Sequence, residues 1–252
     1  MSSFIISVAG KGGVGKTTFS ALAIRHLHQA TGDVVLAVDA DPNANLHAKL
    51  GVTPCRTIGD IREELLAEAD KLPAGVSKQE HVDYQIRLAL TEGDGFDLLT
   101  MGRQEGPGCY CYVNNILRTF VDSQSEKYQL IVIDNEAGME HLSRRTTRAS
   151  NILFVVSDAS KAALESAVRI ASLAREMKLD IDRTALVRNM HSQDAGGMPE
   201  PDGFDAIYSV RRSDEIHIGS IGSESLLTVP LNDPAYADVA KAVDEERRLA
   251  RH

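Results

Sequence analysis

The sequence predicts an α/β fold in which a mostly parallel β-sheet is covered by helices on both faces. Segments of continuously apolar residues, typical of strands buried on both sides, alternate along the chain with segments of helical periodicity. No internal repeat, low-complexity segment or convincing linker divides the 252 residues. We therefore expect a single domain over 1–252.

The strands are expected where apolar runs are bounded by glycine, proline or acidic residues. The apolar run FIISVA is followed by a Gly-rich loop, and VVLAVD by acidic and proline residues. The segment HSQDAGGMPEPDG, from 191 to 203, is the most loop-like part of the chain. The expected strands are Phe4–Ala9, Val34–Asp39, FDLLTMG ending near Gly102, YQLIVIDN, NILFVVSD and RTALVRNM, with DAIYSV and EIHIGSI as short edge strands.

The helices are expected where apolar residues recur at three- and four-residue spacing. The Gly-rich loop leads into a helix with Phe19, Leu22, Ala23 and Leu27 on one face. A later helix carries its apolar positions at Val113, Ile116, Leu117, Phe120 and Val121. The other expected helices are Ile58–Ala69, Lys78–Leu90, Ala162–Met177 and Pro234–Arg251.

Composition argues against several classes of partner. The chain has 27 Lys and Arg against 36 Asp and Glu, a net charge of -9, which argues against broad nucleic-acid binding. The N-terminal MSSFIISVAG does not resemble a signal peptide, and no apolar run reaches transmembrane length. Three cysteines make no disulfide framework. We therefore expect a cytoplasmic protein without a nucleic-acid or membrane partner.

The stretch GKGGVGKTT, from Gly10 to Thr18, matches the pattern G-x-x-x-x-G-K-[ST] between a strand and a helix. Glycines allow backbone N–H groups to close around phosphate oxygens, and the helix N-terminus attracts the anion. A Gly-rich turn without a ligand is the alternative, but the full pattern favours a P-loop NTPase. The expected nucleotide-binding residues are Gly12, Gly13, Val14, Gly15, Lys16, Thr17 and Thr18, with the Lys16 ammonium on the β- and γ-phosphates and the Thr17 hydroxyl on Mg²⁺.

The lysine at position 11 makes the motif more specific. KGGVGKTT resembles the deviant Walker A motif of the MinD, ParA and nitrogenase iron protein class of P-loop ATPases. The resemblance implies that Lys11 reaches the phosphates bound by the partner subunit of a homodimer, as an arginine finger does. A solvated loop lysine is the alternative.

Two acidic segments fit the same class. By resemblance, VDADPNAN supplies Asp41, which orients or activates the attacking water, and Asp39, which lies near Mg²⁺. LIVIDNEAG contains an apolar strand ending in Asp134, a Walker B carboxylate that would hold Mg²⁺ through water. Its DNEAG resembles the switch II pattern D-x-x-A-G, with Gly138 near the γ-phosphate. A helix or turn cap is the alternative role for such aspartates. The resemblance thus implies an ATPase with Lys11, Lys16 and Asp41 as catalytic residues.

Base recognition is expected from two further positions. The class places an adenine-binding amide where LVRNM carries Asn189, and VPLND supplies Pro230, which would pack near the base. A capping or turn role for Asn189 remains open.

The cysteines of GPGCYCYVNN, Cys109 and Cys111, raise the question of a metal site. Two thiolates per chain become four across a two-fold axis, which suits tetrahedral Zn²⁺ or square-planar Ni²⁺. A readily reduced disulfide or a packing role are the alternatives. Cys55 has no partner in sequence and is interpreted as structural.

Taken together, KGGVGKTT, GPGCYCYVNN and DNEAGMEHLSRRTT resemble the CooC-type nickel-insertion ATPases that mature carbon monoxide dehydrogenase. The resemblance implies a homodimer, driven by ATP and metal, that delivers nickel to apo carbon monoxide dehydrogenase or to an acetyl-CoA synthase. One alternative is a MinD/ParA-like positioning ATPase without metal cargo. The other is an iron–sulfur reductase like the nitrogenase iron protein, but the switch II segment lacks the second cysteine that it needs.

Overall fold

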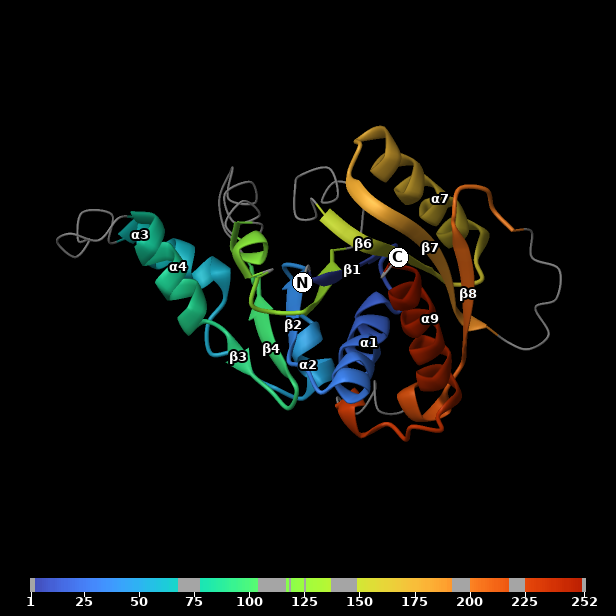
Figure 1. The fold of residues 1–252 in the computed structure, drawn as a ribbon, viewed down its shortest axis with the longest axis horizontal. Helices are drawn as coiled ribbons and strands as arrows, with labels where there is room; N and C mark the ends of the chain where they lie inside the picture. Colours follow the sequence, from blue (N-terminus) through green and yellow to red (C-terminus); the bar gives the residue numbers. More distant parts are fainter. Residues whose placement is uncertain are drawn as a thin grey trace.

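One mixed sheet of eight strands organises the chain (Figure 1). The computed structural model describes residues 3–67, 78–103, 117, 119–124, 126–136, 149–191, 200–217 and 225–250. The strands are β1 Phe4–Gly10, β2 Val35–Ala40, β3 Thr91–Glu92, β4 Phe96–Thr100, β5 Leu130–Asn135, β6 Ala149–Ser157, β7 Asp180–His191 and β8 Ala206–Arg211. Their order is β3-β4-β2-β5-β1-β6-β7-β8, and only the β3–β4 pair is antiparallel. The predicted α/β class with a mostly parallel sheet is confirmed.

Helices cover both faces of this sheet. They are α1 Lys16–Thr31, α2 Leu46–Leu50, α3 Ile58–Ala67, α4 Lys78–Leu88, α7 Lys161–Glu176 and α9 Pro234–Ala250, with a 3₁₀ turn η1 at Leu226–Thr228. Residues 117 and 119–124 are also helical. In Figure 1, α3 and α4 lie at the end of the sheet that carries β3 and β4, and α7 lies near β6 and β7.

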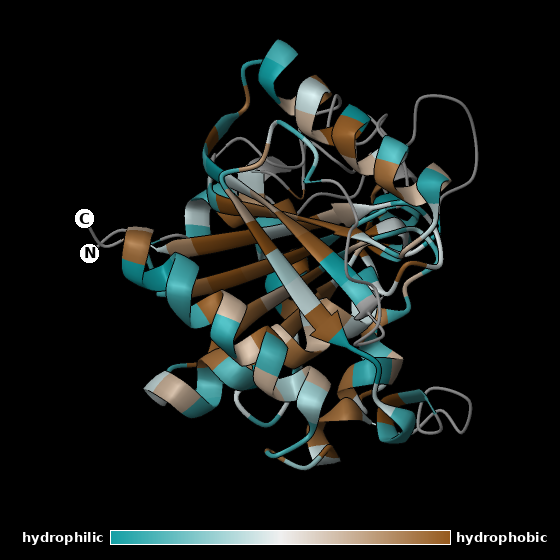
Figure 2. Cartoon of the chain, turned by 90° about the vertical axis from the view of Figure 1, so that its right-hand side faces the viewer, coloured by the Kyte–Doolittle hydropathy of each residue, from teal (hydrophilic) through white to brown (hydrophobic). Residues whose placement is uncertain are grey.

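The buried apolar residues form one large core on one face of the sheet and two smaller cores on the other. The large core joins α1, α2 and α9 to residues such as Ile6, Val35 and Phe154. On the opposite face, α3, α4 and the helix around Phe120 pack on β2, β4 and β5, while α7 packs on β1, β6 and β7. Strands with side chains buried on both sides therefore read as continuous apolar runs, which is why the sequence identified them. Figure 2 shows hydrophobic strands between helices with polar outer faces.

One predicted edge strand is wrong. The segment EIHIGSI was expected to be a strand because its polar and apolar residues alternate, but residues 214–217 form a helical turn. Ser213 caps this turn, since its hydroxyl accepts a hydrogen bond from Ile216 N at 3.1 Å and its carbonyl accepts one from His217 N at 3.1 Å. Local capping thus overrides a short two-residue alternation. Residues 218–221 lie outside the described part of the chain.

Three short features were not predicted. Helix α2 follows β2 directly, strand β3 is a two-residue edge, and β7 extends to His191, into the segment expected to be a loop. Each is too short or too polar to produce a clear hydrophobic period. The helix expected after Cys111 is present at the described residues, 117 and 119–124.

A buried charge network fixes α9 to the far end of the sheet. The Glu246 side chain is fully buried, and its carboxylate accepts hydrogen bonds from Arg183 Nε at 2.6 Å and from the Tyr208 hydroxyl at 2.8 Å. Arg183 belongs to β7, Tyr208 to β8 and Glu246 to α9. Because α9 also packs against α1, this network supports the helix that follows the phosphate loop.

Replacing Glu246 with alanine is expected to lower the free energy of unfolding by about 3 kcal/mol, the lower end for removing one partner of a buried ion pair, since Arg183 retains some access to solvent. Urea denaturation would measure the loss. Glu165→Ala is the matched control, because Glu165 pairs with Lys161 on the surface of α7 and should leave the unfolding midpoint nearly unchanged. Equal losses in the two variants would contradict the assignment of stability to the buried network.

Candidate nucleotide-binding site

The phosphate loop runs from the end of β1 at Gly10 to the start of α1 at Lys16. Gly13 and Gly15 have positive φ angles of 83° and 94°, which favour glycine. At Gly15 the constraint is also steric, because an added Cβ would lie 2.1 Å from Nδ2 of Asn189. The glycines therefore give the loop its shape, and the loop ends on the exposed donors of a helix N-terminus.

Lys16 lies buried under this loop, whereas Lys11, Gly12 and Gly13 are exposed. Its Nζ donates to the carbonyl oxygen of Lys11 at 3.3 Å. Burial lowers the pKa of Lys16, and the carboxylates of Asp134, Asp41 and Glu136 oppose that shift. The ammonium is thus held inside the loop, where phosphate oxygens would be better partners than a carbonyl.

Asp39 and Asp134 lie side by side at the carboxyl ends of neighbouring strands. They are register partners in the β2–β5 pair, and both are almost fully buried. Burial, together with the neighbouring Asp134, raises the pKa of Asp39 to about 7. Burial likewise raises the pKa of Asp134 to about 6, although hydrogen bonds from Thr17 and Ser20 and the charge of Lys16 oppose it. Two neighbouring carboxylates that have lost most of their water favour the binding of a cation beside them.

Asp39 also holds the segment that follows it. Its two carboxylate oxygens accept hydrogen bonds from the backbone N–H of Asp41 at 3.1 Å and of Leu46 at 2.9 Å. The Asp41 side chain is half-buried and accepts hydrogen bonds from the backbone and side-chain nitrogens of Asn43 at 2.8 and 3.0 Å. Asp41 is therefore presented at the site on a loop that Asp39 closes.

The oxygen atoms gathered here suit a magnesium ion. The Thr17 hydroxyl lies near enough to Asp134 to lower the pKa of its carboxyl group, and Asp39 lies on the adjacent strand. Hydroxyl and carboxylate oxygens are the ligands that Mg²⁺ takes in nucleotide sites. The raised pKa values of both carboxyl groups fit the same ion, because a divalent cation would offset the cost of their burial.

A cavity of about 170 Å³ lies beside the phosphate loop along α1. Its wall includes Asn189 at the end of β7, whose Nδ2 donates to the carbonyl oxygen of Val14 at 2.8 Å. The bond to a carbonyl requires the amide nitrogen on that side, so Oδ1 is the acceptor on the other. The other lining residues are Thr18, Phe19, Leu22, Val210, Arg211, Arg212, Ser213, Ile216, His217, Ala235 and Val239.

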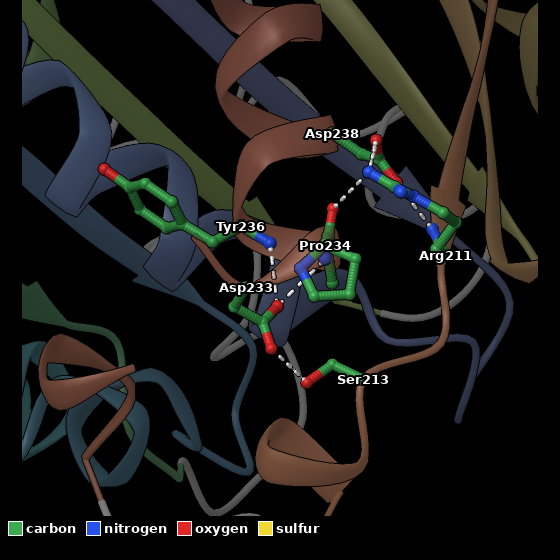
Figure 3. Close-up of polar contacts among 7 residues, drawn as sticks. Arg211, Ser213, Asp233, Pro234, Tyr236 and Asp238 are labelled. Atoms are coloured by element: carbon green, nitrogen blue, oxygen red, sulfur yellow. Dashed lines mark hydrogen bonds and ion pairs between the residues drawn. The ribbon is translucent and has the colours of Figure 1, made fainter. Parts of the chain in front are cut away.

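A polar network holds the outer wall of this cavity (Figure 3). Asp233 caps α9, with Oδ1 accepting from the backbone N–H of Ala235 at 2.9 Å and of Tyr236 at 3.1 Å, and its Oδ2 accepts from the Ser213 hydroxyl at 2.6 Å. Arg211 binds Asp238 through Nε at 2.8 Å. The turn at 214–217 is thereby joined to the first turn of α9, and the cavity lies between fixed elements.

Most of the predicted site residues lie together around the phosphate loop. A few lie elsewhere or outside the described part of the chain. Pro230 lies on an exposed turn after η1 and is not among the cavity-lining residues, so its contact with the base stays a prediction. Cys109, Cys111 and Gly138 lie outside the described residues, within which no group of three or more His, Cys, Asp or Glu side chains could hold a metal. Cys55, interpreted as structural, is an exposed free thiol.

Ser20 was not among the predicted site residues, although it is fully buried and donates to Asp134. Its position three residues after Thr17 places both hydroxyls on one side of α1. That spacing was visible in the sequence, but a small polar residue on an apolar helix face carries no signal without the strand opposite it. The cavity residue His217 was missed because its segment was expected to be a strand, and Arg212 was missed because it lies between the two expected edge strands.

The chain matches a known protein family and is similar to several known proteins. A family model described as an AAA domain matches residues 3–185. The chain belongs to this family. It is 49% identical to an uncharacterized ATP-binding protein of Methanocaldococcus jannaschii, over 73% of this chain and 74% of that protein. It is 31% identical to the carbon monoxide dehydrogenase accessory protein CooC of Rhodospirillum rubrum, over 68% of this chain and 69% of CooC.

Solved structures of other proteins share this fold. The cell division ATPase MinD of Pyrococcus furiosus superposes with a TM-score of 0.71 at 23% identity, over 98% of this chain and 99% of that one. MinD of Pyrococcus horikoshii, solved as a complex with Mg-ADP, gives 0.70 at 20% identity, over 98% and 97%. The chain thus has the MinD/ParA-like P-loop fold, and with its family and phosphate loop it is an ATPase. Among the helices of its described residues, none combines the length and apolarity needed to cross a membrane.

The stability of the metal-free protein is expected to fall as pH rises from about 5 to about 8, by up to roughly 2 kcal/mol per pH unit. Folding raises the pKa of Asp39 to about 7 and of Asp134 to about 6. The folded state therefore binds more protons than the unfolded state in this window, and the stability present at lower pH is lost as pH rises through these pKa values. Thermal unfolding in EDTA across this range would measure the slope.

Asp39→Asn supplies the control for this pH dependence, because histidines also titrate in the window. The variant should show a flatter fall of stability with pH than the wild type. A wild-type slope that the substitution leaves unchanged would contradict the assignment to Asp39.

Proposed function

We propose that the chain is an ATP-hydrolysing metallochaperone that binds nickel at Cys109 and Cys111, shared across a homodimer, and delivers it to apo carbon monoxide dehydrogenase or a related nickel enzyme. The observation that carries the proposal is the 31% identity to a carbon monoxide dehydrogenase accessory protein over 183 residues. A chain with a C-x-C pair besides its ATPase site offers the thiolates that such a cargo needs.

The nucleotide roles follow the geometry of the loop. The backbone N–H groups of residues 12–18 and the buried Lys16 would bind the phosphates, and Asp41 would orient the attacking water. Thr17, Asp39 and Asp134 would hold Mg²⁺, directly or through water. Bound there, the ion would supply positive charge that offsets the negative charge of the β- and γ-phosphates.

The base would enter the cavity next to Thr18, one residue beyond the proposed magnesium ligand. Asn189 then selects the base, because its Nδ2 is used by Val14 and its Oδ1 can accept from the exocyclic amine of adenine. Guanine presents a carbonyl oxygen at the equivalent place and would face Oδ1 unfavourably. In this proposal Pro230 packs near the base from its turn after η1.

Lys11 would act across the dimer. It is exposed in the described structure, and its backbone, rather than its ammonium, contacts Lys16. An exposed lysine at the lip of the phosphate loop can reach a nucleotide on a second chain facing it. ATP and metal would favour the same dimer, since each binds groups of both subunits, and each would therefore strengthen binding of the other.

Anaerobically purified protein supplied with nickel is expected to carry one nickel per dimer in the presence of ATP, because two C-x-C pairs make one four-thiolate site. Native mass spectrometry would read the oligomer and the metal together. The Cys109→Ser/Cys111→Ser variant should form the ATP-dependent dimer without the metal, and Cys55→Ser, a change of an exposed thiol, is the matched control.

The outcomes separate the candidate functions. Nickel retained by the double cysteine variant would contradict the shared thiolate site. A wild-type dimer that forms with ATP but carries no metal, although nickel is supplied, would favour a positioning ATPase. A brown, oxygen-sensitive protein would favour the iron–sulfur reductase.

Lys11→Gln is expected to lower the ATPase rate by about a thousandfold, the lower end of the range for a residue that acts as an arginine finger in trans. A mixing experiment decides whether it acts across the interface. Equimolar Lys11→Gln and Asp41→Asn subunits, each inactive alone, should regain up to about one quarter of wild-type activity, since half of the dimers then hold one complete site. Lys161→Gln, at another exposed lysine, is the control. Mixtures that stay inactive would mean that Lys11 and Asp41 serve the same subunit.

A further inference from the structure

Two hydroxyl groups on successive turns of α1 act on the same carboxylate. Ser20 Oγ donates to Asp134 Oδ1 at 3.0 Å, and the Thr17 hydroxyl also lowers the pKa of Asp134. Ser20 is fully buried, Asp134 is 1% exposed, and 114 residues separate them in sequence. The contact therefore joins the second turn of the phosphate-loop helix to the end of β5.

The direction of this hydrogen bond is fixed by chemistry. An ionised carboxylate only accepts, so the Ser20 hydroxyl must donate its single proton to Asp134. Serine within a helix commonly bonds to the carbonyl oxygen one turn earlier, and here it bonds to the carboxylate of a distant strand instead. Ser20 thus supplies a hydrogen bond to the charged form of a group that has lost most of its water.

The surroundings of Asp134 give that bond a further consequence. The charged neighbours that act on the carboxylate are Lys16, which attracts it, and Asp41, which repels it, while Asp39 adjoins it on β2. Without a neutral donor on Oδ1, the carboxylate is free to turn toward the ammonium of Lys16. That rotation would draw the lysine away from phosphate oxygens and the carboxylate away from Thr17.

We propose that Ser20 is a positioning residue for the magnesium site, fixing the Asp134 carboxylate so that its other lone pairs face Thr17 and the hydration shell of the ion. The inference rests on the proposed Mg²⁺ site and adds to it a residue that touches neither nucleotide nor metal. Hydrogen bonds that orient metal-binding carboxylates are worth about 10- to 100-fold in metal affinity. Ser20 is expected to act through the metal and to leave metal-free nucleotide binding nearly unchanged.

The test measures binding of ADP by isothermal titration calorimetry, once with excess MgCl₂ and once with EDTA. The dissociation constant in EDTA divided by that in MgCl₂ is the factor by which Mg²⁺ strengthens ADP binding. Ser20→Ala should lower that ratio by about tenfold, while the affinity in EDTA stays within about twofold of the wild type. Ser20→Thr keeps the hydroxyl and should retain the wild-type ratio.

Ser7→Ala is the matched control. Ser7 is a fully buried serine on β1 whose Oγ lies 2.8 Å from the Ser150 Oγ, so its removal also deletes a buried hydrogen bond. This variant should keep the wild-type ratio, and thermal melts would verify that all variants fold.

Three results would overturn the inference. A wild-type ratio in Ser20→Ala would reject Ser20 and leave the magnesium site standing. Equal losses of affinity with and without Mg²⁺ would make the serine merely structural. Wild-type protein that binds ADP equally well with Mg²⁺ and with EDTA would reject the proposed magnesium site itself, and the role of Ser20 with it.

Discussion

The site depends on charge that is buried before any ligand arrives. Asp39 and Asp134 occupy neighbouring strands with almost no exposure, and Lys16 is buried across from them. Burial opposes ionisation of all three groups, raising the pKa values of the acids and lowering that of the lysine. Such a cluster is costly alone and becomes favourable when phosphate and a divalent cation complete it. These buried charges therefore favour binding of an anion and a divalent cation at this edge of the sheet.

Sheet topology is what brings these charges together. β1 lies at the centre of the sheet between β5 and β6, and β2 lies beyond β5. Parallel strands end at the same edge, so Gly10, Asp39 and Asp134 meet there although they are far apart in sequence. The sequence predicted that each of these residues follows a buried strand, because each comes after a continuous apolar run, and the resemblance to the MinD and ParA class implied that they serve one site.

What could not be predicted depends on partners that sequence spacing does not reveal. Ser20 is an ordinary helix residue until β5 brings Asp134 beside it. The turn at 214–217 alternates like a strand, and only the cap from Ser213 decides its form. The cavity beside the phosphate loop likewise needs Asn189, Val210 and Ala235, which come from three separate elements. Local patterns identify strands and the phosphate loop, whereas tertiary contacts decide short turns and the residues that support a site.

Helix α1 joins these separate contributions. Its first turn would supply Lys16 and Thr17 to the phosphates and the metal, Ser20 reaches Asp134, and Phe19 and Leu22 form a wall of the cavity beside the phosphate loop. Most of the helix is buried between the sheet, α2 and α9, so it cannot shift without disturbing the large core. A response to nucleotide is therefore expected in parts outside this helix, and among the described residues the exposed Lys11 side chain and the loop after Asp39 are placed to give it. In the proposed dimer, these parts would contact the second chain. A rigid helix that binds ATP and exposed parts that respond to it would together make dimerisation depend on ATP.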